Sequence, residues 1–451
     1  MNELRIEEEL KEYKKLGRGN WGEGFGLLKG MYNGFITRIR DEAAEMEEEQ
    51  DEIMPPMKML LNLLLDLRNA RREGRKICMH PFNYGPELLY TMGLVPLMQE
   101  LFSVGLATTH INEFYLDITN KIGYGDNPTL CNAQRPLIGA YMQKAAPVPD
   151  LLFFLSTPCN SLSITYQVFQ HITNVPLFNI DIPYWAHEHS SEFYDERIMD
   201  YMLSQLKNFI PWLEKQTNRK FEIEKFQETM NLVNQSREYV SDFNELLKTV
   251  PCPVPSIAGF GNWLAMTLRG GTSEAVKVTK YIRDQAAERV KEGLGGVEDE
   301  KLRIAWPYTH VFFDQELFKW LEEEFQAVTI MDILGFYPVG PHDTSTLEKC
   351  YESLALGTLD YSMIGTCRGP VEYFVDFLIN WINEYKIDCV IIPMQFACKH
   401  AYAMTTLASE IARQETGVPT LVFGCDPYDS REVPSETIRA KISEFLNQIV
   451  L

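Results

Sequence analysis

Short apolar segments alternate with amphipathic segments along most of the chain, and this alternation constrains the fold more than any other feature of the sequence. The apolar segments are short and rich in β-branched and aromatic residues, which favours buried strands over helices. Because parallel strands that are covered on both faces carry such continuous apolar runs, the pattern predicts an α/β fold. The expected strands lie at 76–80, 150–156, 175–180, 302–307, 327–332, 388–394 and 418–424.

The amphipathic segments between these strands have the periodicity of helices. In the first half, helices are expected to begin near Gly85, Cys131 and Ser161. In the second half, the expected helices lie at 314–325, 372–385, 400–415 and 434–451. The two halves therefore have similar layouts, which suggests a duplicated, doubly wound parallel-sheet unit.

The 451 residues divide into four regions by composition. Residues 1–75 are predicted to form an N-terminal helical extension, and residues 76–187 a first α/β domain. Residues 188–300 are helical and rich in charge, with a break at Pro251–Pro255, and are interpreted as a helical bridge or insertion. Residues 301–451 are predicted to form the second α/β domain.

The charge balance excludes some classes of partner. The chain has 63 acidic and 42 basic residues, a formal net charge of −21, so a nucleic-acid or anionic-membrane surface is not expected. The acidic run from Asp41 to Glu52 is interpreted as a solvated helix face, with a partner-docking surface as the alternative. We expect no membrane span and no signal peptide, because no long apolar segment is present, and therefore expect a cytoplasmic protein.

Common catalytic motifs are absent from the sequence. It has no G-x-x-x-x-G-K-[ST], no G-x-S-x-G, no H-E-x-x-H, and no G-x-G-x-x-G after a strand. The chain is therefore not expected to bind ATP as a P-loop protein does. His187 and His189 lie close together but lack further ligands at metal-binding spacing, so a polar loop is favoured over a metal site.

Three of the nine cysteines follow a pattern that suggests a shared site. Cys159 and Cys398 each come after the carboxyl end of a predicted strand and before a predicted helix, and Cys131 is expected to open a helix. In open α/β sheets, ligands bind outside the carboxyl ends of the strands, and helix N-termini there stabilise thiolates. The three could converge in a cleft between the domains and hold a [4Fe-4S] cluster with one open iron. Zinc is the competing ligand, and buried core thiols are the structural alternative.

The remaining cysteines have weaker positions in the pattern. Cys78 and Cys389 lie within predicted strands and are expected to be core thiols. Cys252 lies in a proline-rich loop, Cys350 on a helix, and Cys367 and Cys425 near the expected cleft as accessory candidates.

Two polar residues follow the first predicted strand. His80 and Asn83 are candidates for hydrogen-bonding or proton-handling groups at the cleft, because they come after the carboxyl end of the strand. The alternative is that they only order the loop.

The segments around the three cysteines resemble those of the 2-hydroxyacyl-CoA dehydratase and benzoyl-CoA reductase family. The resemblance extends from about Lys76 to Leu451 and depends on the order and spacing of the segments taken together. They are GDNPTLCNAQRPLIGAY (125–141), PDLLFFLSTPCNSLSITYQVF (149–169), VPLFNIDIPY (175–184), RGGTSEAVKVTKYI (269–282), IDCVIIPMQFACKHAYAM (387–404) and VPTLVFGCDPYDSREVPSETIRAKISEFL (418–446).

The resemblance implies two Rossmann-like domains and a [4Fe-4S] cluster held by Cys131, Cys159 and Cys398. It also implies an acyl-CoA substrate, a related sister subunit and a separate ATP-dependent iron–sulfur activator, although a homodimer stays open. Some relatives hold a double-cubane cluster with additional cysteines. Here the segment after 327–332 and the segment PFNYGPELL lack a cysteine, which argues against six cysteine ligands. Cys367 matches a cysteine-bearing position in some reductase-type relatives.

Three functions follow as expectations. The first is a 2-hydroxyacyl-CoA dehydratase subunit, in which one electron on the thioester carbonyl gives a ketyl radical anion that expels the neighbouring hydroxyl. The second is a benzoyl-CoA reductase subunit, which reduces an aromatic acyl-CoA. The third is an electron-transfer subunit without its own substrate, which a fourth protein ligand on the open iron would favour.

Overall fold

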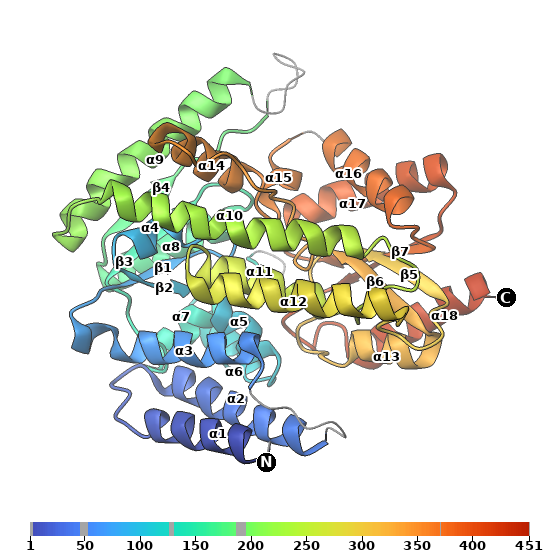
Figure 1. Ribbon diagram of the computed structural model, residues 1–451, viewed down its shortest axis with the longest axis horizontal. Coiled ribbons are helices and arrows are strands. Elements are labelled where there is room, and N and C mark those ends of the chain that lie inside the picture. The colour runs from blue at the N-terminus through green and yellow to red at the C-terminus, as the bar shows by residue number, and fades with distance from the viewer. Residues whose placement is uncertain (1–2, 46–52, 126–129, 186–194, 370, 451) are drawn as a thin grey trace.

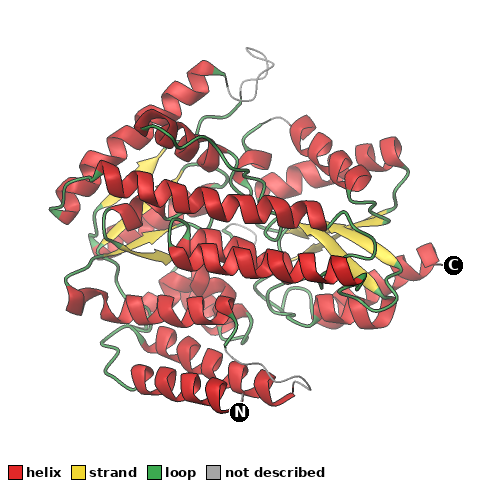
Figure 2. Ribbon diagram, in the orientation of Figure 1, coloured by secondary structure: helices red, strands yellow, loops and turns green. Residues whose placement is uncertain are grey.

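The computed structural model describes residues 3–45, 53–125, 130–185, 195–369 and 371–450 (Figure 1). Its strands form two separate four-stranded parallel sheets with helices packed around them, as Figure 2 shows. The predicted α/β class is therefore confirmed. All seven predicted strands are present, and the structure adds an eighth.

The first sheet has the strand order β2-β1-β3-β4, and all its strands are parallel. Residues on both faces of its first three strands are buried, because helices cover both sides. The strands are β1 (Ile77–His80), β2 (Val95–Met98), β3 (Leu151–Leu155) and β4 (Leu177–Ile180). The helices are α4 (Glu87–Thr91), α5 (Glu100–Ala107), α6 (Asn112–Lys121), α7 (Arg135–Met142) and α8 (Asn160–Thr173).

Strand β2 is the one that the sequence did not predict. It has only four residues, one of which is Pro96. Proline cannot donate to a sheet, so it argues against a central strand but is tolerated at an edge. β2 lies at the edge of the sheet and pairs only with β1.

The second sheet repeats this arrangement in the order β6-β5-β7-β8. In each sheet the chain reverses its direction of winding beside the first strand, between β1 and β3 and between β5 and β7. Ligand crevices form at such points. The strands are β5 (Leu302–Trp306), β6 (Ala327–Asp332), β7 (Cys389–Gln395) and β8 (Thr420–Cys425). The helices are α13 (Leu317–Phe325), α14 (Leu347–Leu359), α15 (Ile364–Cys367), α16 (Val371–Glu384), α17 (Lys399–Thr416) and α18 (Ser435–Val450).

Four helices connect the two sheets, and the described residues between β4 and β5 contain no strand. Helices α10 and α12 run across the molecule beside both sheets (Figure 1). α10 packs against α4 of the first half and α14 of the second, so it joins the two halves. These helices are α9 (Glu196–Thr217), α10 (Ile223–Leu246), α11 (Ala258–Arg269) and α12 (Ser273–Glu292).

The N-terminal region is helical, as expected. It consists of α1 (Glu3–Gly17), α2 (Gly26–Glu45), α3 (Pro55–Asn69) and the 3₁₀ helix η1 (Ala70–Glu73). The acidic run extends beyond α2 into residues 46–52, which lie outside the described residues. The domain boundaries at 75, 187 and 300 stay predictions. No helix among the described residues is long and apolar enough to cross a membrane.

Gly139 lets helix α7 pack closely against α6. A Cβ atom at Gly139 would lie 2.3 Å from the backbone oxygen of Tyr115. We expect Gly139→Ala to lower the free energy of unfolding by about 1–3 kcal/mol, because the backbones must separate. Gly30→Ala is the control. Gly30 lies within α2 with no atom near its missing Cβ, so alanine should instead raise the stability by about 0.5–1 kcal/mol. Chemical denaturation measures both; equal effects would contradict this account of α7.

Candidate functional site

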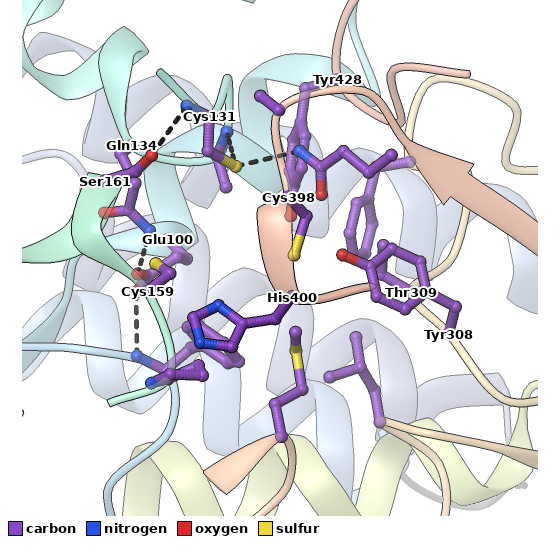
Figure 3. A pocket seen from close by; sticks show the side chains of 18 of the residues that line it. Glu100, Cys131, Gln134, Cys159, Ser161, Tyr308, Thr309, Cys398, His400 and Tyr428 are labelled. Carbon is purple, nitrogen blue, oxygen red and sulfur yellow. Dashed lines mark hydrogen bonds between the residues drawn. The ribbon is translucent and has the colours of Figure 1, made fainter. Parts of the chain in front are cut away.

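One cavity lies between the two halves and collects cysteines from both (Figure 3). Cys131 and Cys159 come from the first half, and Cys398 from the second. The cavity has an empty volume of about 710 Å³, part of which is open to solvent. Its apolar walls include Phe82, Val104, Trp263, Phe312 and Leu334. The structure thus brings the three predicted cysteines to one place.

Cys159 lies between strand β3 and helix α8, at the position that caps the helix. Its sulfur accepts a hydrogen bond from the Leu162 N–H at 3.4 Å. A capping side chain satisfies one of the free N–H groups of the first turn, and the positive end of the helix dipole favours a negative charge there. The sequence-based placement of Cys159 is confirmed.

Cys398 has the matching position in the second half. It lies three residues beyond β7 and caps helix α17. Its sulfur faces the hydroxyl group of Tyr308 (Figure 3). The Tyr308 hydroxyl is buried and has no hydrogen-bond partner among the described residues. An unsatisfied buried hydroxyl at the wall of a cavity points to a ligand that it would contact.

Cys131 does not open a helix, contrary to the sequence-based expectation. Helix α7 begins at Arg135, because the ring of Pro136 suits only the first turn of a helix. Cys131 lies in the preceding turn, where its N–H donates to the Ser161 hydroxyl at 3.2 Å.

Two groups hold the Cys131 sulfur. The side-chain N–H of Gln395 donates to it at 2.9 Å, and the Ala133 N–H donates at 3.3 Å. Gln395 is the last residue of β7, so the second half of the molecule positions a cysteine of the first. A second link joins the same turn to the residue after β8, since the Asn132 amide donates to Asp426 at 3.1 Å.

Burial keeps the three thiols protonated in the absence of a ligand. It raises the pKa of Cys159 to about 12, and the nearby Cys398 adds to that rise. Burial likewise raises the pKa of Cys131, with contributions from Cys159 and Cys398. The pKa of Cys398 is raised by burial, and the Tyr308 side chain counteracts part of the rise. A metal that binds these sulfurs must displace their protons.

The donor set is suited to an iron–sulfur cluster. Thiolates are the usual ligands of [4Fe-4S] clusters, and N–H groups that point at sulfur stabilise their charge. Within the described ranges, no group of three or more His, Cys, Asp or Glu side chains is arranged to hold a single metal ion. A cluster differs in this respect, because each thiolate binds a different iron. Cys131, Cys159 and Cys398 therefore fit the predicted group in their chemistry.

His80 and Asn83 are not among the residues that line the cavity. His80 is fully buried, its ring stacks on Phe153 at a centroid distance of 6.2 Å, and burial lowers its pKa to about 4. The Asn83 amide donates to the backbone oxygen of Thr157 at 2.9 Å, two residues before Cys159. Asn83 thus supports the loop that carries Cys159, and a role of either residue in proton transfer stays a prediction. His187 and His189 lie outside the described residues.

Loss of the Asn83 amide should weaken the Cys159 loop. We expect Asn83→Ala to lower the free energy of unfolding by about 1–3 kcal/mol, because the buried Thr157 oxygen loses its donor. Gln167→Ala is a matched control, since the Gln167 amide also donates to a backbone oxygen, but on the exposed face of α8. That change should alter the stability by less than about 0.5 kcal/mol. Denaturant titration measures both, and equal values would dismiss the loop-ordering role.

Sequence reasoning missed several residues of the cavity wall. Glu100 is buried there, and its carboxylate accepts hydrogen bonds from the Gln134 amide at 2.8 Å and the Phe82 N–H at 2.9 Å. Burial raises the pKa of Glu100 to about 7, and the bond from Gln134 opposes the rise. His400 projects into the same space (Figure 3). Glu100 follows β2, so recognising that short edge strand would have identified it.

The other cysteines divide between the core and the cavity. Cys78 and Cys389 lie in β1 and β7 and are fully buried, as expected. Cys425, an accessory candidate, ends β8 inside an apolar cluster and does not line the cavity. Cys367, the other candidate, does line it. All nine cysteines lie in the described part of the chain and none is in a disulfide.

Comparison with known proteins places this geometry in a family. The sequence profile of the 2-hydroxyglutaryl-CoA dehydratase D-component matches residues 81–449. The chain is 22% identical over 395 residues to lactoyl-CoA dehydratase subunit alpha of Anaerotignum propionicum, covering 81% of this chain and 89% of the relative. It is 23% identical over 397 residues to the (R)-phenyllactyl-CoA dehydratase alpha subunit of Clostridium sporogenes, covering 85% and 91%. A benzoyl-CoA reductase subunit of Thauera aromatica is 23% identical over 322 residues, covering 68% and 72%.

Proposed function

The chain belongs to the 2-hydroxyglutaryl-CoA dehydratase D-component family, and we propose that it is the iron–sulfur subunit of an enzyme that removes water from a 2-hydroxyacyl-CoA thioester. The observation that carries the proposal is the cavity in which Cys131, Cys159 and Cys398 meet. Relatives named as alpha subunits of lactoyl-CoA and phenyllactyl-CoA dehydratases support this reaction class.

Cys131, Cys159 and Cys398 would hold a [4Fe-4S] cluster, which supplies low-potential, one-electron chemistry when bound. The amide of Gln395 and the N–H groups of Ala133 and Leu162 would stabilise the thiolates from outside. The unsatisfied Tyr308 hydroxyl supplies a donor on the cavity side, next to Cys398.

The proposed reaction needs a dry cavity and a group that moves a proton. One electron on the thioester carbonyl gives a ketyl radical anion, which expels the neighbouring hydroxyl. The aromatic and aliphatic walls around Phe82, Trp263 and Phe312 exclude water from such a radical. Removal of water also requires loss of a proton from the neighbouring carbon. The Glu100 carboxylate, whose pKa burial raises to about 7, is suited to accept it.

We propose that a related sister subunit and a separate ATP-dependent iron–sulfur activator complete the enzyme. The relatives are themselves named as single subunits of dehydratases and of a reductase, which supports a sister subunit. The missing P-loop motif supports an activator that hydrolyses ATP elsewhere.

The finer fold and location predictions belong to the same proposal. The identical strand order of the two sheets supports Rossmann-like, doubly wound units. Nine free cysteines suit a reducing, cytoplasmic compartment.

A benzoyl-CoA reductase subunit is the second candidate function. It is supported by the similarity to one subunit of that enzyme over 68% of this chain. Both candidates use the same cysteines, so the substrate decides between them.

The deciding experiment is an anaerobic assay of the chain with its sister subunit and activator. The panel contains 2-hydroxyacyl-CoA thioesters, with and without aromatic side chains, and benzoyl-CoA. We expect formation of the 2-enoyl-CoA product from at least one hydroxy thioester and no consumption of benzoyl-CoA. Ring reduction without dehydration would replace the first candidate by the second.

A further inference from the structure

A fourth cysteine lies on the wall of the cavity that contains Cys131, Cys159 and Cys398. Cys367 is the last residue of the short helix α15, in the second half of the molecule. It is buried and lines the same cavity as the other three. Its thiol also interacts electrostatically with Cys398 and Cys159, so it lies near two of the three proposed ligands.

Position separates Cys367 from the other cysteines that the proposed function does not use. Cys78, Cys389 and Cys425 are parts of strands and pack in apolar clusters. Cys252 and Cys350 are buried outside the cavity and contact the backbone oxygens of Val254 and Thr344, each at 3.4 Å. Cys367 contacts only the neighbouring Thr366 hydroxyl, at 3.9 Å, which leaves its sulfur available to the cavity.

A [4Fe-4S] cluster has four irons, and four cysteine thiolates are its usual complete ligand set. Three thiolates leave one iron without a protein ligand. We infer that Cys367 supplies the fourth thiolate, so that no iron of the cluster is open in the substrate-free protein. This inference rests on the proposed function, because it requires the cluster at Cys131, Cys159 and Cys398.

A fourth thiolate would change how the site operates. A substrate oxygen could reach the fourth iron only by displacing the Cys367 sulfur. Alternatively, the cluster would only transfer electrons and leave substrate binding to another subunit. Under either condition the short helix α15, which carries Cys367, controls access to that iron.

The full-length chain, assembled anaerobically with ⁵⁷Fe and sulfide, tests the inference without substrate or turnover. The samples are the native chain, Cys367→Ala and Cys389→Ala, which removes a buried cysteine outside the cavity. Mössbauer spectra of the native chain and Cys389→Ala should show all irons in sulfur-only surroundings. In Cys367→Ala, about one iron in four should become distinct, because one of the four ligands is lost.

Mild oxidation provides the second measurement. Cys367→Ala should lose its unprotected iron and give the electron paramagnetic resonance signal of a three-iron cluster at least tenfold more strongly than the native chain. The native spectrum keeps the test valid even if Cys367→Ala does not fold. A distinct iron already present in the native chain would overturn the inference while leaving the proposed function intact. A native chain that assembles no iron–sulfur cluster would overturn both.

Discussion

Cys159→Ala is expected to abolish the iron–sulfur cluster. Cys159 provides one of the three proposed thiolates, from a position fixed by the end of β3 and the start of α8. Alanine has no sulfur, so iron should fall from about four per chain to near zero, together with the visible absorbance. Iron and sulfide analysis of anaerobically purified protein measures the change.

Cys389→Ala is the matched control for this prediction. Cys389 is fully buried in β7 but lies outside the cavity, so its loss should leave the iron content unchanged. Circular dichroism of both variants establishes that they are folded. Full iron in a folded Cys159→Ala protein would refute the assignment of Cys159 as a ligand.

The second large effect concerns partners. We expect the chain alone, with dithionite, ATP and the acyl-CoA panel, to give no sustained turnover. The reason is that the sequence has no nucleotide-binding motif with which to drive electrons to low potential. Sustained turnover should appear only after the sister subunit and the activator are both added. Turnover by the chain alone would disprove the partner requirement.

The net charge of −21 sets a condition on that assembly. Two acidic surfaces repel each other, so a partner should dock on a locally basic or uncharged patch. The patch should lie near the cavity, because electrons must reach the cysteines.

Much of the fold was predictable because apolar strands and amphipathic helices have different periods. β1, β3 and β7 are buried runs that continue for four or more residues, so their positions were found to within two residues. β2 was missed because Pro96 argues against a strand unless its edge position is known. Which strand lies at an edge is a property of the whole sheet, and the local sequence does not contain it.

The site was predictable only in part for a related reason. Cys159 and Cys398 follow strands and cap helices, and both features are local. Gln395 reaches Cys131 across 264 residues of sequence, a contact that no local pattern indicates. His80 and Cys425 end their strands but do not line the cavity. Successive side chains of a strand point to opposite faces, so the pattern did not decide which face theirs would take.

The metal content of the native chain tests the central claim most directly. Protein produced and purified anaerobically should contain about four irons and four sulfides per chain, with the absorbance of a [4Fe-4S] cluster. About one zinc per chain without iron would contradict the account, because the cysteines of the cavity would then serve a different metal.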